Sequence, residues 1–199
     1  MPQPEARQAV LDLFRSTGAY LAGHFRLTSG LHSAAYLQCA LVLQHPRIAE
    51  DLGRRLAEAL AALVQAERIG LVASPAIGGL IIGHEVARAL GARFIFAERD
   101  ASGKMTLRRG FEVTAGETAV VIEDVITTGG STREVIDSLR ERGARVLAAG
   151  SIIDRSGGKV DLGVPRVALE AVAVESYPSE SCPLCAEGIP VVKPGSRRT

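Results

Sequence analysis

The chain contains the stretch Val120-Val121-Ile122-Glu123-Asp124-Val125-Ile126-Thr127-Thr128-Gly129-Gly130-Ser131. Its apolar, mostly β-branched start is typical of a strand that is buried on both faces of a parallel sheet. Two carboxylates, a loop of small residues and a helical pattern from Arg133 to Arg142 follow. Because ligands of open α/β sheets bind at the carboxyl ends of strands, this junction predicts a binding site.

The residue types of this junction indicate the ligand. Glycines 129 and 130 expose backbone N–H groups, and hydroxyl side chains surround them, so the loop and the helix N-terminus can bind a phosphate. Glu123 and Asp124 would repel a phosphate and are expected to face vicinal hydroxyls or a metal ion. A ribose 5-phosphate meets both requirements. A helix N-cap after a buried strand would explain the glycines and the serine, but not the two carboxylates.

Composition limits the class of protein. The chain has 199 residues, 47% of them hydrophobic, which is enough for one α/β domain with its own core. A net charge of +1 argues against a nucleic-acid partner across the whole surface. No apolar run approaches the length of a membrane span, and the N-terminus lacks a signal-peptide pattern. Three cysteines favour a reduced, cytoplasmic protein.

Hydrophobic periodicity predicts the order of elements. Helices are expected over 4–17, 46–64, a segment that ends at 90, and 133–142; strands are expected over 69–73, 93–97, the apolar run at 120, 145–153 and 167–174, with two short strands within 23–37. The predicted fold is α/β, a central parallel sheet flanked by helices. A single domain spans 1–199, with a core over about 46–175 and a small hood from about 18–40 plus the C-terminal segment.

A second strand–loop–helix junction lies at 74–79, Ser-Pro-Ala-Ile-Gly-Gly. It is no Walker loop, because no Gly-Lys-Ser/Thr follows, and taken alone it is a weak signal.

The stretch from Val121 to Ser131 resembles the signature of the type I phosphoribosyltransferases, which bind 5-phosphoribosyl 1-pyrophosphate (PRPP). That pattern is an apolar run, two acids, two apolar residues and Thr-x-Gly-x-Ser/Thr. The resemblance implies that the two acids bind the ribose hydroxyls and that the loop holds the 5-phosphate. The implied PRPP-binding residues are Glu123, Asp124, Val125, Ile126, Thr127, Thr128, Gly129, Gly130 and Ser131, with Ile77 and Gly78 at the pyrophosphate.

The spacing Phe25-x-Leu27-x-Ser29-Gly30-x-x-Ser33-x-x-Tyr36 is similar to the hood of the orotate phosphoribosyltransferases. This family usually has a basic residue before Ser-Gly; here Thr28 stands there, and Arg26 lies on the same strand face. The resemblance implies transfer of ribose 5-phosphate from PRPP to orotate, which forms orotidine 5′-monophosphate and pyrophosphate in pyrimidine (UMP) biosynthesis.

The resemblance also implies substrate contacts. Arg155 and Thr127 would bind orotate, with Arg155 on its carboxylate; the alternative for Arg155 is an ion pair with Asp154 or Glu123. Mg²⁺ would bind through PRPP, with no direct protein ligand.

The polar connection from Glu98 to Gly110 resembles the family's catalytic loop, which reaches the site of the neighbouring subunit. Arg99, Lys104 and Asp124 are the implied catalytic residues, and a homodimer is the implied assembly. The second lysine and the histidine of the usual loop pattern are missing. The other interpretation of this connection is a solvated hairpin tip.

Two alternatives to this function stay open: a purine phosphoribosyltransferase, and a PRPP-binding regulator that has lost catalysis.

Cys182-x-x-Cys185 is a weak indication of zinc, because a closed zinc site needs four ligands. Cys39 and a symmetry-related chain could supply more, but a reduced structural tail is expected. His24 and His32 fit no metal spacing and are expected on the surface or in hood packing.

Overall fold

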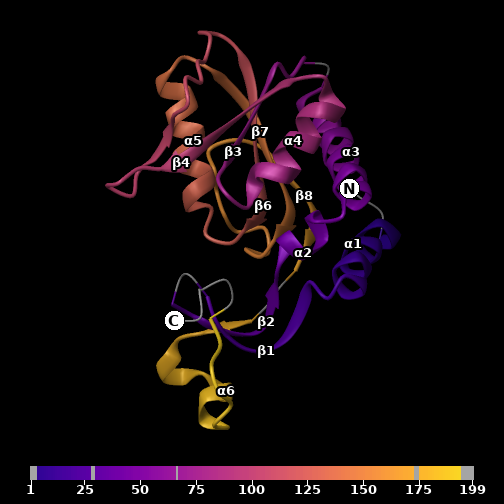
Figure 1. Cartoon of the computed structure of the whole chain (residues 1–199), viewed down its shortest axis with the longest axis vertical. Helices are drawn as coiled ribbons and strands as arrows, with labels where there is room; N and C mark the ends of the chain where they lie inside the picture. The colour runs from indigo at the N-terminus through magenta and orange to yellow at the C-terminus, as the bar shows by residue number, and fades with distance from the viewer. Residues whose placement is uncertain (1–3, 28–29, 66, 173–174, 194–199) are drawn as a thin grey trace.

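Two β-sheets and the helices around them form the structure, a computed structural model that describes residues 4–27, 30–65, 67–172 and 175–193 (Figure 1). The helices are α1 (Pro4–Ser16), α2 (Cys39–Leu43), α3 (Pro46–Val64), α4 (Gly79–Leu90), α5 (Gly130–Glu141) and α6 (Pro183–Ala186), with a 3₁₀ turn, η1, at Ser179–Ser181. The strands are β1 (Tyr20–Arg26), β2 (His32–Leu37), β3 (Leu71–Pro75), β4 (Arg93–Arg99), β5 (Met105–Leu107), β6 (Thr118–Ile126), β7 (Arg145–Asp154), β8 (Arg166–Ala171) and β9 (Ser176–Tyr177). Within the described ranges, no helix has both the length and the apolar character needed to cross a membrane.

The larger sheet has the strand order β5-β4-β3-β6-β7-β8. All of its neighbouring pairs are parallel except β4 and β5, which form an antiparallel hairpin. This confirms the predicted α/β fold with a central parallel sheet. The chain proceeds from β3 outward to β4 on one side and returns to β6 on the other. That change of direction creates a crevice outside the carboxyl ends of β3 and β6, where ligands bind in folds of this kind.

Strand β6 is buried on both faces, as the apolar run predicts. Val120 and Ile122 pack in one hydrophobic cluster with α3 and α4, while Ala119 and Val121 pack in a second cluster with α5. Figure 1 shows the same division, with α5 on one face of the sheet and α3 and α4 on the other. Two buried faces leave the carboxyl end as the place where β6 can present polar side chains to a ligand.

Helix α5 begins earlier than the periodicity predicts, at Gly130 instead of Arg133. Gly129 precedes it with φ of 73°, in the left-handed region, and the Arg133 N–H already donates to the Gly129 carbonyl at 2.9 Å. The hydrophobic pattern starts only where the helix meets the core, so it missed the first turn. Ser131 therefore lies in the first turn of the helix rather than in the loop.

The smaller sheet has the order β1-β2-β9 and forms the hood. Its third strand comes from the C-terminal segment, which also returns along β1, where Val192 exchanges backbone hydrogen bonds with His24 and Arg26 at 2.8 Å each. In Figure 1 the hood lies beyond the lower edge of the core, with α6 farthest from the sheet. Thr28 and Ser29 of the predicted turn, and Val174 of the predicted last strand, lie outside the described residues.

Helices α3 and α4 pack closely at Gly53. A Cβ at this position would lie 2.5 Å from the Cβ of Glu85 and 2.9 Å from its carbonyl carbon. Alanine is the better helix former by about 1 kcal/mol, but forcing extra atoms into a packed contact costs about 1–3 kcal/mol.

We therefore expect Gly53→Ala to lower the free energy of unfolding by as much as about 2 kcal/mol, measured by urea denaturation. Ala61→Gly, at an exposed position of the same helix, calibrates the helix-propensity contribution. A Gly53→Ala protein that is more stable than the wild type would show that the two helices can separate without cost.

Candidate active site

A cavity of about 420 Å³ opens outside the carboxyl ends of β6 and β7, beside the crevice that the strand order creates. Its volume falls within the range of small-molecule sites. The lining residues come from the carboxyl ends of β6 and β7 and from the hood: Leu27, Tyr36, Leu37, Gln38, Asp124, Val125, Thr127, Thr128 and Arg155. The structure thus brings the predicted acid, the threonine loop and Arg155 to one cavity, although 31 positions separate the two ends of this set on the core side, from Asp124 to Arg155.

The loop after β6 is shaped to bind an anion. Gly129 cannot carry a side chain, because a Cβ there would lie 2.6 Å from Val160 and 2.7 Å from Leu162. No side chain caps the start of α5 at this glycine. The first N–H groups of the helix therefore point toward the crevice with the positive end of the helix dipole, and Thr127 and Thr128 stand exposed beside them.

The two acids at the end of β6 occupy different environments. Glu123 is buried, and its burial, followed by the neighbouring charge of Asp124, raises its pKa well above the usual range. Asp124 lines the cavity and accepts a hydrogen bond from the Val125 N–H at 2.8 Å. Asp124 is therefore the acid that faces the cavity, and Glu123 lies behind it.

The loop between β3 and α4 lies directly against these acids. A Cβ on Gly78 would come within 2.6 Å of an Asp124 carboxylate oxygen, so only glycine leaves that carboxylate in place. Ile77, before it, is 82% exposed. The predicted pyrophosphate loop and the predicted ribose-binding acids are thus neighbours, as one ligand spanning both would require.

Arg155 lines the cavity, and its guanidinium has no hydrogen bond or ion pair with the other described residues. Its Nε and Nη2 atoms are buried and have no hydrogen-bond partner, and burial lowers the pKa of its guanidinium. The alternative of an ion pair with Asp154 is wrong: Asp154 is bound by Arg166 at 2.7 Å and by the Ser156 N–H at 2.7 Å. Leaving buried donors unpaired is costly, so an acceptor from a ligand is the expected partner of Arg155.

The hood contributes cavity residues that the sequence did not single out. Leu37 and Gln38 were not singled out, and Leu27 and Tyr36 entered only through the spacing of the hood motif. Burial, followed by the charge of Asp124, raises the pKa of Tyr36, which keeps the phenol neutral and able to donate. The only local signal for these positions was the alternation of β2, which does not reveal which face meets a ligand.

The connection from Glu98 to Gly110 contains the hairpin of β4 and β5. Asp100 forms its turn by accepting hydrogen bonds from the Ser102 and Lys104 N–H groups at 2.8 and 3.1 Å. Arg99 pairs with Glu134 and donates to the Ser131 hydroxyl at 3.2 Å, next to the phosphate loop of its own chain. Lys104 is exposed and does not line the cavity. Neither of the two predicted lid cations lines the cavity, and the contact with Ser131 brings Arg99, but not Lys104, to the loop after β6.

A divalent cation fits the donor set at the cavity. Among the described residues, no lysine or arginine contributes to the shifted pKa of Glu123, whose neighbour Asp124 is also an acid. To be stable, the negative charge of these carboxylates needs a cation or hydroxyl donors that a ligand brings. Carboxylate oxygens are the ligands that Mg²⁺ prefers, directly or through water.

Comparison with known proteins identifies the family. The phosphoribosyl transferase domain matches residues 41–166. A protein of Pelotomaculum thermopropionicum named orotate phosphoribosyltransferase is 55% identical over 192 residues, which cover 96% of this chain and 98% of the relative. The chain belongs to the orotate phosphoribosyltransferase family.

Two further family members support this placement. The orotate phosphoribosyltransferase of Heliobacterium modesticaldum is 55% identical over 195 residues, covering 96% of this chain and 99% of the relative. The crystal structure of the enzyme from Aeropyrum pernix is 26% identical, with a TM-score of 0.67 over 82% of this chain and 93% of that chain. The resemblance found in the β6 stretch and in the hood motif is thereby confirmed.

The buried acid Glu123 predicts a pH-dependent stability. Because its pKa is raised in the folded state, the folded protein holds this proton more tightly, and stability falls as pH rises from the unfolded pKa of about 4.3. Glu123→Gln should therefore raise the Tm at pH 8, with about 2–4 °C for each kcal/mol gained, and the gain should shrink toward pH 4.

Thermal unfolding at both pH values, without substrates, measures this effect. Glu58→Gln, at an exposed position, is the matched control and should change stability by less than about 0.5 kcal/mol. A lower Tm for Glu123→Gln, or an equal change at both pH values, would contradict the proposed cost of burying this charge.

Proposed function

We propose that the protein transfers the 5-phosphoribosyl group of PRPP to orotate and releases orotidine 5′-monophosphate and pyrophosphate, a step of pyrimidine (UMP) biosynthesis. The observation that carries this proposal is the unpaired, half-buried Arg155 beside the phosphate-binding loop in one cavity. The free cysteines of the protein fit a cytoplasmic location, where thiols stay reduced.

PRPP would bind across the carboxyl ends of β3 and β6. The loop of Val125 to Ser131 and the first turn of α5 would hold the 5-phosphate through N–H and hydroxyl donors. Asp124 would accept hydrogen bonds from the ribose hydroxyls, with Glu123 behind it. Ile77 and Gly78 would lie along the pyrophosphate, where the backbone is open because residue 78 has no side chain.

Orotate would bind under the hood, with its carboxylate on Arg155 and its ring near Thr127. A planar guanidinium can bind a carboxylate through two parallel hydrogen bonds, and a buried one does so with little competition from water. A purine has no carboxylate to satisfy Arg155. A regulator that binds PRPP alone would likewise leave these buried donors unpaired.

The reaction replaces the bond between the anomeric carbon and pyrophosphate by a bond to the orotate ring nitrogen, which gives up its proton. It passes through a state with positive charge on the ribose, as glycosyl transfer does. Asp124 and the phosphate loop would hold the ribose in line between the two groups. When Mg²⁺ is bound to PRPP, it neutralises part of the charge of the leaving pyrophosphate. Tyr36 and the apolar hood residues would exclude water from the cationic ribose.

The hairpin of β4 and β5 would complete this site in a homodimer. It extends away from the body of the chain (Figure 1), and Lys104 at its end lies outside the cavity of its own chain. A partner's site is therefore the better target for Lys104, where it would approach the pyrophosphate. Arg99 contacts Ser131 of its own chain and would therefore act on the phosphate loop of its own site.

Arg155→Ala should lower kcat/KM for orotate by about ten- to a hundredfold, because a charge-assisted hydrogen bond contributes about 1.5–3 kcal/mol. Arg155→Lys should recover only part of this loss, since an ammonium cannot reproduce the paired geometry. The KM for PRPP should change little. Steady-state kinetics with each substrate varied in turn measure both constants.

Arg140→Ala is the matched control, because Arg140 donates to the Gly163 carbonyl outside the cavity. Normal orotate kinetics with weakened PRPP binding in Arg155→Ala would contradict the proposal and make Arg155 a phosphate contact.

Subunit mixing tests the lid. If Lys104 acts in the partner's site, mixing Lys104→Ala with Asp124→Asn restores one complete site in each heterodimer. Random exchange should then recover about a quarter of wild-type activity, since half the dimers are mixed and carry one of two sites. The pair Arg99→Ala and Asp124→Asn should not recover, because both residues serve one chain's site. Equal behaviour of the two mixtures, with exchange confirmed by native mass spectrometry, would refute this division of roles.

A further inference from the structure

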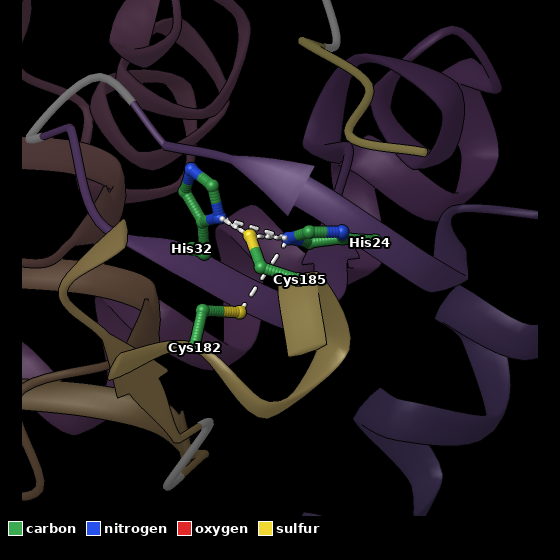
Figure 2. A group of neighbouring side chains, drawn as sticks. All are labelled: His24, His32, Cys182 and Cys185. Atoms are coloured by element: carbon green, nitrogen blue, oxygen red, sulfur yellow. Dashed lines mark hydrogen bonds between the residues drawn. The ribbon is translucent and has the colours of Figure 1, made fainter. Parts of the chain in front are cut away.

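Four side chains that can ligate a metal converge in the hood. His24 comes from β1, His32 from β2, and Cys182 and Cys185 from the turn around α6 (Figure 2). One ligand atom of each lies within 4.8 Å of all the others. The chain has four histidines and three cysteines in 199 residues, so this cluster gathers two of each.

Three of the distances between these atoms are close to those of a tetrahedral site. With Zn–N of about 2.0–2.1 Å and Zn–S of about 2.3 Å, an N and an S ligand lie about 3.6 Å apart, and two N ligands about 3.3 Å apart. The Cys182 and Cys185 Sγ atoms lie 3.5 and 3.7 Å from His24 Nε2, and Cys185 Sγ lies 3.3 Å from His32 Nδ1. The two nitrogens are 2.8 Å apart, so they would separate by about half an ångström around an ion.

The hydrogen bond of the His24 ring leaves the lone pair of Nε2 directed into the cluster. Its Nδ1 lies 2.7 Å from the carbonyl oxygen of Ile189, which can only accept a hydrogen bond. Nδ1 therefore carries the proton, and Nε2 is the basic nitrogen. A backbone carbonyl that holds the other ring N–H is the usual support of a histidine metal ligand.

Hydrogen bonding alone does not satisfy this arrangement. Three groups approach Nε2 of His24: Nδ1 of His32 and the sulfurs of Cys182 and Cys185. A neutral imidazole nitrogen offers one lone pair and can accept one good hydrogen bond. A single cation between the four atoms would instead use the lone pairs of all of them.

The site is closed to solvent on most sides. His24, His32 and Cys182 are 3%, 6% and 3% exposed, and Cys185 alone reaches the surface. Four protein ligands leave no open position for a substrate, which is the mark of a structural rather than a catalytic site. Two nitrogens and two sulfurs also suit zinc better than Mg²⁺, which prefers oxygen.

Few contacts hold the C-terminal segment against the rest of the hood. Strand β9 has two residues, and the exposed apolar residues Ile189, Val191 and Val192 show how little of the segment is buried. Units this small rarely have enough core to be stable alone and are often held by a metal or a disulfide. Two of the four candidate ligands lie in the β1–β2 hairpin and two in the C-terminal segment, so a bound ion would connect these two parts of the hood.

We propose that His24 Nε2, His32 Nδ1, Cys182 Sγ and Cys185 Sγ bind one Zn²⁺, which fixes the C-terminal segment to the hood. Binding releases the two thiol protons to solvent, so that both sulfurs coordinate as thiolates. This differs from the sequence-based expectation that the histidines fit no metal spacing and that the two cysteines belong to a reduced structural tail. It also excludes Cys39 from the site, because Cys39 lies buried beside Asp124 instead.

Metal content of the full chain tests the proposal. The protein is purified under reducing conditions without a histidine tag, and its metals are measured by inductively coupled plasma mass spectrometry. We expect about one zinc per chain. The double variant Cys182→Ser, Cys185→Ser and the single variant His24→Gln should lose it. His84→Gln and Cys39→Ala are matched controls outside the cluster and should retain it.

Cobalt substitution tests the ligand set in the unaltered chain, in case a variant fails to fold. After chelation, Co²⁺ should give the intense visible bands of tetrahedral geometry and a near-ultraviolet thiolate charge-transfer band. Zn²⁺, but not Mg²⁺, should displace Co²⁺ and restore the Tm and the resistance of the segment after Tyr177 to proteolysis.

Three outcomes would overturn the proposal. They are a wild-type chain that binds no zinc even when Zn²⁺ is added, a Cys182–Cys185 disulfide in the reduced preparation, and full zinc content in the double cysteine variant.

Discussion

The site depends on one electrostatic constraint at the end of β6. Within a few residues, the chain places two carboxylates and the positive end of the α5 dipole, and it buries one of the carboxylates. The helix end attracts an anion, whereas the acids repel one and attract hydroxyls or a cation. A ligand with a phosphate at one end and a diol about one sugar away would meet both requirements. The burial of Glu123 is a cost to stability, because desolvation disfavours its charged form.

The proposed choice of base depends on a second constraint, the isolation of Arg155. Asp154 is the adjacent acid and could have neutralised it, but Arg166 and Ser156 occupy that carboxylate. The side chain of Arg155 is thereby left with unpaired donors on the wall of the cavity. The hood covers the same space with Tyr36 and Leu37, so the cation and the apolar cover line one cavity, as the proposed binding of a planar, acidic ligand requires.

The sequence pattern predicted those features of the fold that depend on residues close together in the chain. The helix Pro46–Val64 was predicted with its observed ends, because a proline begins it and one apolar stripe runs its length. The start of α5 was missed, since a left-handed glycine rather than the hydrophobic pattern sets it. The Asp154–Arg166 pair and the His24–Cys182 contact join positions 12 and 158 residues apart. Such pairings arise from tertiary packing, which periodicity and spacing do not encode.

The central claim is that an unpaired guanidinium selects an acidic pyrimidine as the acceptor. The most direct test measures pyrophosphate release from PRPP and Mg²⁺ by the wild-type protein, with orotate, uracil or adenine as the acceptor. The account predicts a kcat/KM for orotate that exceeds the values for uracil and adenine by about ten- to a hundredfold or more. Comparable efficiency with uracil or adenine would contradict it.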